Sequence, residues 1–564
     1  MRPIDRKRVV LAALALAVTL EAVASNAPAR APNGMVVSQN EIASRIGVEV
    51  MQKGGNAIDA AVATAFALAV THPTAGNIGG GGFLVFRPAE GEPVAFDFRE
   101  MAPAEAGETM WLEDGEYSPE RHHYSHLSVG VPGTVAGLHL AWQAHGSLPW
   151  KRLVEPAVRL ARGGFEVTDG LARSLERAME RMGKYPASKA QFTKNGEPYE
   201  AGDTLKQPDL AESLSRIAKR GPAGFYEGKT AELIEQEMQA HGGLITREDL
   251  KAYRAKKRKP IRGTYRGYEI IAMPPPSSGG VALVEMLNVL EGFDLAGEGF
   301  GSARNLHRMV ESMRKAYSDR AQYLGDPDFN PEMPLARLTS KEYATELRKT
   351  IRLDQASNSS PESFDWPKES SETTHFSVVD RERNAVALTY TLEYGYGSGI
   401  VVPGAGFLLN NEMGDFNAAP GLTDERGLIG TKPNLPAPHK RMLSSMSPTI
   451  LAKDGELFMV TGSPGGRSII NTVLQTILNV VDHGMNAQAA VDAGRIHHQW
   501  LPDRIQYERQ SFSPDTLRIL TSLGHTLKES EIQGVAQVIV VDSENGMLEG
   551  GLDRRVPDGG AAGY

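Results

Sequence analysis

A threonine at the junction between a polar stretch and a strand is the first candidate for chemistry. Thr373 follows Glu372, where a serine-rich stretch from 353 to 372 gives way to the strand-like run 375–379. A threonine hydroxyl is a weak nucleophile unless a base takes its proton, and the α-amine of an N-terminal threonine can be that base. An internal threonine gains such an amine only when the bond before it is cut. Thr373 is therefore a candidate nucleophile, although a threonine that merely begins a strand is the commoner situation.

Other groups that could do chemistry are weaker candidates. His122, His123 and His126 could place two imidazoles on one helix face, but the Gly- and Pro-rich sequence after them makes a helix doubtful. No third ligand is evident, so we expect no metal site there. His497 and His498 are interpreted as structural. The chain has no cysteine, which excludes disulfides, cysteine-ligated metals and thiol nucleophiles, and no cofactor is expected.

Helices and hairpins in both halves must position these groups. Hydrophobic patterning predicts helices over 57–70 and 468–481, and mostly helical structure from 131 to 350. Strand patterns predict two hairpins, one pairing 83–86 with 94–99 and one pairing 375–379 with 384–391. Turn residues predict two more, around Asp454-Gly455 and Asn545-Gly546. The stretch 353–372 is expected to be solvated and mobile. The glycines at 79–82 lack dinucleotide-binding spacing and predict close backbone packing. This arrangement favours packed sheets covered by helices.

Composition places the chain among ordinary globular proteins. It has 564 residues, 41% hydrophobic and 23% charged, with a net charge of −9. These values argue against a disordered or polytopic membrane protein. A net negative charge does not attract the phosphate backbone of a nucleic acid, so nucleic acid is not an expected partner.

The first residues resemble an export signal. Four basic residues within 2–8 precede the apolar run 9–20, and Ala22-Val23-Ala24 supplies a small-residue cleavage pattern. Twelve apolar residues are too few to span a bilayer. We expect a signal peptide at 1–24, no membrane span after its removal, and a periplasmic or secreted protein.

Several longer motifs extend the argument beyond Thr373. They are the segments 54–61, 79–82, 98–103, 131–137, 373–380, 389–392, 409–413, 415–416, 440–441, 443–449, 461–466 and 497–500. In this order they resemble the gamma-glutamyltransferase family of bacterial transpeptidases and glutathione hydrolases, over nearly the whole chain after residue 24.

The resemblance implies a fold and an activity. The fold would be α+β, an αββα sandwich of the N-terminal-nucleophile hydrolase type. The precursor would cut itself between Glu372 and Thr373, giving a large subunit, 25–372, and a small catalytic subunit, 373–564, that remain together as a heterodimer. The enzyme would transfer the γ-glutamyl group of glutathione or related donors to water, amino acids or peptides through an acyl-enzyme.

It also implies roles for individual residues. Thr373 would be the nucleophile and Thr391 its hydrogen-bonding partner. Gly465 and Gly466 would form the oxyanion hole, which is physically reasonable because they precede a predicted helix. From the residues alone, a turn is the simpler interpretation of this pair.

The donor's glutamyl end would be held by a polar set of residues. Arg99 would bind the α-carboxylate with help from Ser444 and Ser445, whereas Glu393, Glu412 and Asp415 would face the α-ammonium. Glu393 and Glu412 stand where many family members carry Asn and Gln, which makes this pocket more negative.

Residues 420–438 correspond to a lid loop that some members have. Arg426 stands where an aromatic gate is expected, which leaves the balance of hydrolysis and transfer open.

Three alternatives remain at this stage. A cephalosporin or glutaryl acylase shares the scaffold but takes donors without the α-amine. A poly-γ-glutamate depolymerase is disfavoured because it is expected to lack the lid. An exported non-catalytic binding protein is disfavoured by the retention of Thr373, Thr391, Arg99 and the glycine pair.

Overall fold

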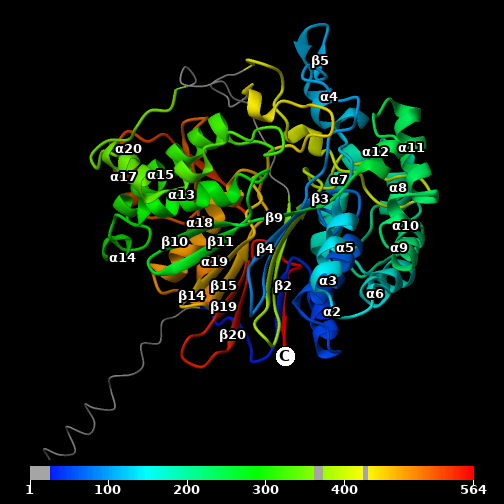
Figure 1. Ribbon diagram of the computed structural model, residues 1–564, viewed down its shortest axis with the longest axis horizontal. Helices are drawn as coiled ribbons and strands as arrows, with labels where there is room; N and C mark the ends of the chain where they lie inside the picture. Colours follow the sequence, from blue (N-terminus) through cyan, green and yellow to red (C-terminus); the bar gives the residue numbers. More distant parts are fainter. Residues whose placement is uncertain (1–25, 361–372, 423–429) are drawn as a thin grey trace, which may run out of the picture.

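Two antiparallel sheets packed face to face form the centre of the computed structural model (Figure 1). The structure describes residues 26–360, 373–422 and 430–564. The predicted signal peptide, Glu372 and Arg426 lie outside these ranges.

The first sheet carries the candidate nucleophile. In spatial order its strands are β21 (Gly560–Gly563), β2 (Met35–Ser38), β12 (Thr374–Val379), β13 (Ala385–Thr391), β3 (Gly81–Arg87), β4 (Val94–Phe98) and β9 (Lys256–Arg258). Because β12 and β13 are central, their side chains are buried along their whole length.

The second sheet supplies the opposite wall. Its order is β1 (Ala29–Ala31), β20 (Leu548–Leu552), β19 (Gln537–Val541), β15 (Glu456–Gly462), β14 (Thr449–Lys453), β11 (Tyr268–Ala272) and β10 (Ile261–Tyr265). β12 and β13 both contact β15 across the interface between the sheets.

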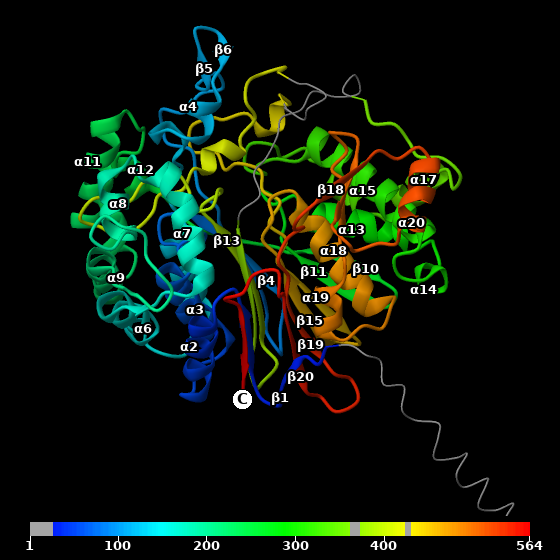
Figure 2. The same ribbon diagram turned by 180° about the vertical axis from the view of Figure 1, so that it is seen from behind.

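Helices cover the outer face of each sheet (Figures 1 and 2). Beside the first sheet lie α2 (Glu41–Gln52), α3 (Ala57–Thr71), α5 (Thr134–His145), α6 (Trp150–Gly163), α7 (Asp169–Met182), α8 (Pro186–Phe192), α9 (Pro208–Arg220), α10 (Ala223–Tyr226), α11 (Lys229–His241) and α12 (Arg247–Ala252). Beside the second lie α13 (Gly279–Leu290), α14 (Leu295–Glu298), α15 (Ala303–Tyr323), α16 (Leu335–Leu338), α17 (Lys341–Lys349), α18 (Ser468–Val481), α19 (Ala487–Asp492) and α20 (Pro514–Ser522). The predicted αββα sandwich is confirmed.

Short elements complete the chain. They are α4 (Pro119–His123), the 3-10 turns η1 (His126–Ser128), η3 (Glu412–Asp415) and η4 (Lys432–Asn434), and the strands β5 (Leu112–Glu113), β6 (Glu116–Tyr117), β7 (Phe165–Glu166), β8 (Thr204–Leu205), β16 (Ile496–His497), β17 (Ile505–Glu508) and β18 (Leu527–Ser530).

Alternation along the strands builds two cores. On β3, Phe83 and Val85 pack toward the second sheet, whereas Leu84 and Phe86 pack under the helices of the first sheet. This follows from the two-residue period of a strand. α3 is buried at every position, so it has no polar face to reveal its orientation.

The local predictions are largely confirmed. The 57–70 helix is α3, the 468–481 helix is α18, and the four hairpins are present. In its described part, 353–360, the stretch is solvated as predicted, since no residue there is buried, but main-chain hydrogen bonds anchor it to the rest of the protein. The amides of Ala356, Ser357 and Ser359 donate to Leu523 O, Glu311 Oε1 and Asp503 Oδ2 at 2.7–3.1 Å.

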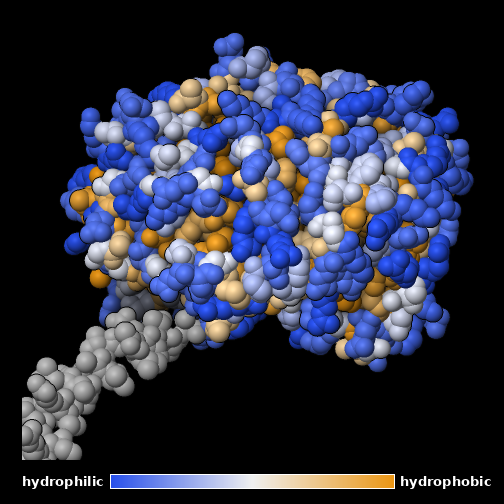
Figure 3. Space-filling model, turned by 60° about the horizontal axis from the view of Figure 1, so that its bottom comes forward, coloured by the Kyte–Doolittle hydropathy of each residue, from blue (hydrophilic) through white to orange (hydrophobic). Residues whose placement is uncertain are grey.

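The surface fits the composition. On the face seen in Figure 3, polar side chains are interspersed with small apolar patches. Among the described residues, no helix has the length and apolar character needed to cross a membrane.

Candidate active site

Thr373 lies at the entrance to β12, beside the end of the neighbouring strand. Its side chain is buried, and its Oγ1 is 3.5 Å from Thr391 Oγ1, at the last residue of β13. Thr391 Oγ1 also accepts a hydrogen bond from the Glu393 amide at 2.9 Å. The antiparallel pairing of β12 with β13 therefore brings together two hydroxyls that are 18 residues apart.

The glycine run keeps these strand ends close. A Cβ on Gly80 would lie 2.0 Å from Thr391 O, and one on Gly82 would lie 2.4 Å from Thr389 O. Neither distance is possible for a real side chain, so the predicted close backbone packing is confirmed. Asn77 Nδ2 donates to the same Thr391 carbonyl at 2.8 Å.

Gly465 and Gly466 form the turn that leads into α18. Their φ angles are +133° and +55°, a region that favours glycine. The Tyr317 hydroxyl donates to Arg467 O and so fixes the end of this turn. Gly466 lines the same cleft as Thr373. The sequence-predicted oxyanion pair thus lies beside the candidate nucleophile.

That cleft gathers most of the predicted site residues. It has a volume of about 260 Å³, measured to its open mouth. Its lining is Arg99, Thr373, Thr391, Glu393, Glu412, Asp415, Ser444, Ser445, Met446, Gly466 and Ile469. We call it the acyl pocket.

Arg99 is the cationic centre of the acyl pocket. It follows β4, is fully buried, and donates to Glu412 Oε1 through Nη1 and to Asp415 Oδ2 through Nη2. Glu100 Oε2 lies 3.6 Å from Arg99 Nη1. Burial opposes the charged guanidinium, but the carboxylates outweigh it and raise the pKa of Arg99.

The acids around Arg99 are crowded and desolvated. Burial raises the pKa of Glu100 to about 8 and raises that of Glu412 well above its ordinary value, although Arg99 opposes both shifts. Glu412 Oε2 has no hydrogen-bond partner among the described residues. The pocket therefore offers a buried carboxyl oxygen of Glu412, and a cation bound beside it would favour the ionised form.

Glu393 reaches the pocket through an unusual backbone conformation. Its φ is +78°, which is uncommon for a residue with a side chain and marks local strain. The carboxylate is buried, and Oε1 lies 3.5 Å from His123 Nδ1. Burial lowers the pKa of His123 to about 4, so this imidazole does not neutralise the carboxylate at neutral pH.

The serine pair is fixed by a segment far away in the sequence. Ser278 donates to Ser444 O from both its amide and its hydroxyl, at 2.8 and 2.7 Å, and Ser444 N donates to Pro276 O at 2.9 Å. Arg320 Nη2 donates to Ser445 Oγ at 3.1 Å, and its Nε donates to Ser278 Oγ at 2.8 Å. The Pro- and Gly-rich stretch 274–280 therefore holds the serine loop.

The flanks of the predicted lid lie against the pocket. Asn434 Nδ2 donates to Asp415 O at 2.7 Å, and its Oδ1 accepts from Leu443 N at 2.8 Å. These contacts place the described part of 420–438 beside Asp415.

A second cavity meets the acyl pocket at Thr373. It measures about 1600 Å³ to its open mouth and is lined by Thr373, Gly465, residues of α7 that include Arg177, and the segments 531–535 and 555–558. We call it the amine-side cavity. Thr373 lines both spaces.

The histidines singled out in the sequence lie on different elements of the fold. α4 contains His122 and His123, which contact each other at a ring separation of 4.2 Å, whereas His126 lies on η1. His497 is held by Asn471 at 2.7 Å, and His498 by Asp503 at 3.2 Å, as expected for structural residues.

Some residues around the site were not predicted. Glu100 directly follows Arg99 within the motif 98–103 but was given no role, whereas His123 and Arg320 reach the site through long-range contacts that no local pattern marks. The 274–280 stretch was visible in the sequence, but nothing there indicated which loop it holds.

Comparisons with known proteins agree with this geometry. A family model described as Gamma-glutamyltranspeptidase matches residues 43–564. The glutathione hydrolase proenzyme of Escherichia coli (strain K12) is 50% identical over 542 residues, which cover 95% of this chain and 93% of that protein. The Acylase ACY 1 proenzyme of Pseudomonas sp. (strain V22) is 37% identical and covers 93% of this chain and 92% of its own length.

The similar solved structures include an acylase and a gamma-glutamyltranspeptidase. A cephalosporin acylase from Bacillus halodurans has a TM-score of 0.84 at 29% identity, covering 96% of this chain and 97% of that one. A gamma-glutamyltranspeptidase chain from Helicobacter pylori has a TM-score of 0.55 at 48% identity, covering 56% of this chain and 91% of that one.

Proposed function

The chain belongs to the gamma-glutamyltranspeptidase family, and from this premise we propose that it is an autoprocessed gamma-glutamyltransferase with glutathione hydrolase activity. Glutathione and related γ-glutamyl compounds are the donors; water, amino acids and peptides are the acceptors. The observation that carries the proposal is the junction of Thr373 with a buried pocket that holds one guanidinium and several carboxylates.

Cleavage of the Glu372–Thr373 bond creates the catalytic group. It leaves a large chain, 25–372 after signal removal, and a small chain, 373–564, joined in the sandwich. β12 of the small chain lies between β2 of the large chain and β13, so the sheet itself holds the subunits together. The proenzyme names of the relatives and the partial-length H. pylori chain support this view.

Acyl transfer then proceeds at Thr373. The new α-amine takes the Oγ1 proton while Oγ1 bonds to the donor's γ-carbonyl carbon, and the carbonyl becomes an oxyanion. As the intermediate collapses, the C–N bond breaks and the proton passes to the leaving amine. Water or an acceptor amine then attacks the ester and releases Thr373 with its proton restored.

Two groups assist these steps. The Thr391 hydroxyl, 3.5 Å from Thr373 Oγ1, orients the nucleophile. The backbone amides of Gly465 and Gly466, ahead of α18, are suited to stabilise the oxyanion, because fixed dipoles act strongly in a site shielded from water.

The donor's charges match the acyl pocket. The fork of Arg99 suits a carboxylate, and the hydroxyls of Ser444 and Ser445 can add hydrogen bonds to it. The α-ammonium adds a second positive charge beside Glu393, Glu412 and Asp415, which the single charge of Arg99 does not balance. In this arrangement the donor ammonium takes a place near Glu412 Oε2.

The leaving group occupies the opposite side of the nucleophile. With the γ-glutamyl moiety in the acyl pocket, the scissile nitrogen points away from Arg99 toward the amine-side cavity. This cavity is wide enough for a dipeptide, and Arg177 on its wall is exposed to solvent. An acceptor amine approaches by the same route.

An acylase activity is the second candidate, because one of the similar sequences and one of the similar solved structures are acylases. A glutaryl donor would bring a carboxylate to Arg99 but no ammonium to the acids. The retained Asp415 and the additional Glu393 and Glu412 therefore favour the transferase.

The export proposal rests on the sequence. A basic stretch, a short apolar run and a small-residue cleavage pattern at 1–24 support a signal peptide and a periplasmic or secreted enzyme.

A donor panel tests the proposed function. The purified wild type should run as two chains on a denaturing gel and should hydrolyse γ-glutamyl-4-nitroanilide at least about 30-fold better than glutaryl-4-nitroanilide, as expected from the roughly 2–5 kcal/mol lost when a desolvated charge loses its partner. Equal rates with the two anilides would replace the transferase with the acylase. A single uncleaved chain with no activity would indicate a binding protein.

A further inference from the structure

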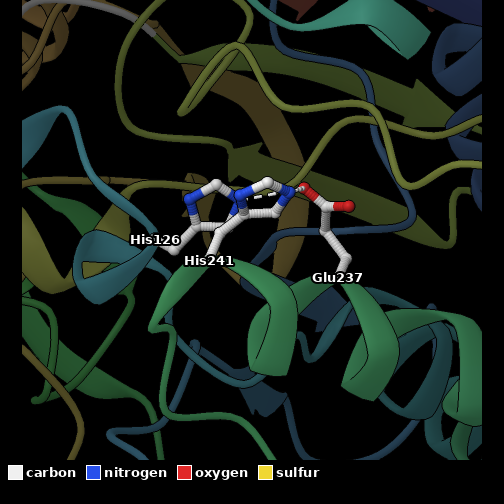
Figure 4. Close-up of side chains that lie close together, drawn as sticks. All are labelled: His126, Glu237 and His241. Atoms are coloured by element: carbon white, nitrogen blue, oxygen red, sulfur yellow. Dashed lines mark hydrogen bonds and ion pairs between the residues drawn. The ribbon is translucent and has the colours of Figure 1, made fainter.

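A side-chain cluster outside the acyl pocket has the donors of a metal site. Figure 4 shows the rings of His126 and His241 stacked, with the Glu237 carboxylate beside them. Glu237 and His241 are four residues apart on α11, so they share one helix face, while His126 comes from η1. The sequence offered His126 without a third ligand; the fold supplies two.

The distances suit a shared ion. His126 Nε2 lies 2.9 Å from Glu237 Oε1, and His241 Nε2 lies 3.7 Å from the same oxygen. Donors bound tetrahedrally to zinc at about 2.0–2.2 Å lie roughly 3.3 Å apart, and the two distances bracket this value. The ring centroids are 4.8 Å apart with a 23° interplanar angle, so small side-chain rotations bring all three donors to one point.

Burial and charge also fit an ion. The side chains of His126 and Glu237 are 8% and 10% exposed, whereas that of His241 is 54% exposed. Two ligands are thus held by packing, and the third leaves an entry path and room for water. Glu237 makes its described ion pairs with these two histidines, so no lysine or arginine there competes for its carboxylate.

A second cluster provides a contrast. His307, Glu311 and His525 are all buried and also lie close together. There, however, His307 bonds His525 at 2.8 Å and Arg352 O at 2.7 Å, and Arg314 Nε is 3.4 Å from Glu311. There the two imidazoles bond each other and Arg314 already places a cation beside Glu311, although Glu311 Oε2 has no hydrogen-bond partner among the described residues.

We propose that His126, Glu237 and His241 bind a divalent transition metal of the zinc class. Two imidazoles and a carboxylate are the ligand types that zinc prefers, with water completing the coordination. The ion would tie α11 to the segment that carries α4 and η1. His123 on that segment lies 3.5 Å from Glu393, so the ion would fasten one wall of the acyl pocket from outside.

The test uses the processed enzyme without a polyhistidine tag, stripped with EDTA. Zn²⁺ is titrated by calorimetry, and Co²⁺ by its visible absorption. We expect one ion per large chain, that is, one per heterodimer, and a Zn²⁺-dependent rise in Tm. His241→Ala and Glu237→Gln should each weaken Zn²⁺ binding at least about tenfold. Glu232→Gln, a change at a half-exposed position on the same helix, is the matched control and should bind as the wild type does.

Three results would overturn the proposal: no Zn²⁺ uptake by the wild type, unchanged binding in both variants, or loss of the ion in His525→Ala instead. Because His241 is half exposed, its substitution should leave the fold intact. Hydrolysis of γ-glutamyl-4-nitroanilide, measured in parallel, reports on the proposed function separately, since metal binding does not depend on it.

Discussion

The two spaces that meet at Thr373 differ in nearly every physical respect. The acyl pocket is small, buried and crowded with charge, and Arg99 is fixed in it by Glu412 and Asp415. The amine-side cavity is about six times larger, and its lining mixes apolar side chains such as Ile532 and Val535 with charged ones such as Glu531, Asp558 and the exposed Arg177. Interactions between desolvated charges are strong and geometrically strict, whereas exposed ones are weak. We therefore expect strict selection of the acyl group and loose selection of the amine.

Thr373→Ala should have the largest effect, because it removes what both spaces share. The variant should remain one uncleaved chain without activity, since it has neither the attacking hydroxyl nor a way to release the amine. Thr373→Ser, which keeps the hydroxyl, should process slowly and retain partial activity. Gel analysis and the anilide assay check both. An active, uncleaved alanine variant would contradict the mechanism.

Arg99→Lys should be next in size. It keeps the charge but loses the planar fork, so kcat/KM should fall at least about 100-fold for γ-glutamyl and glutaryl anilides alike. Processing should continue, because in the proposed mechanism Arg99 binds the donor and takes no part in cutting the Glu372–Thr373 bond. A donor-specific loss would mean that Arg99 does not bind the carboxylate common to both.

Asp415→Asn should lower kcat/KM for the γ-glutamyl donor much more than for the glutaryl donor. Without this carboxylate the γ-glutamyl ammonium loses a desolvated partner, so kcat/KM should fall about 30-fold or more. Glutaryl anilide has no ammonium and should change little. If the variant weakens both donors equally, Asp415 acts through Arg99 alone.

Arg177→Gln tests the amine-side cavity, where we expect loose selection of the leaving amine. An exposed charge contributes about 0.2–1 kcal/mol, so kcat/KM for glutathione, whose leaving dipeptide carries a carboxylate, should fall by a factor of about 1.4 to 5. The rate with γ-glutamyl-4-nitroanilide should not change. Arg173→Gln is the matched control, because Arg173 lies on the same helix and pairs with Asp169. Equal effects of the two substitutions would remove Arg177 from the leaving-group path.

Glu100→Gln should have the smallest effect on rate but a visible one on stability. With a pKa near 8, Glu100 keeps its proton in the folded protein after the unfolded chain has lost it near 4.5. The wild type should therefore lose stability as pH rises from about 4.5 to about 8, and the variant should lose less. Thermal unfolding across this range measures the difference. Parallel curves would show that Glu100 does not hold its proton.

The sequence was sufficient for features that are local. α18 begins and ends at the predicted residues because its apolar period and preceding glycines are contained in one stretch. The β12–β13 hairpin was predictable from two strand patterns and a charged turn. These features already indicated Thr373 as the start of a strand.

Long-range contacts were not predictable from single segments. Arg320 is a buried cation on α15 that donates hydrogen bonds to Ser278 and Ser445. The helical pattern around Arg320 does not predict either contact. The anchoring of 356–359 was missed because the stretch uses main-chain amides, which composition does not reveal. The site residues of the pocket were found through resemblance; spacing alone would not have joined Arg99 to Asp415, which lie 316 residues apart.

Intact-mass spectrometry of the small chain is the most direct test of the central claim that Thr373 is an N-terminal nucleophile. The purified enzyme should yield a chain that begins at Thr373, and acid quenching during turnover of a γ-glutamyl donor should add the mass of one glutamyl group to it. Peptide mapping should locate that group on Thr373. An active enzyme whose small chain begins elsewhere, or an adduct on another residue, would contradict the account.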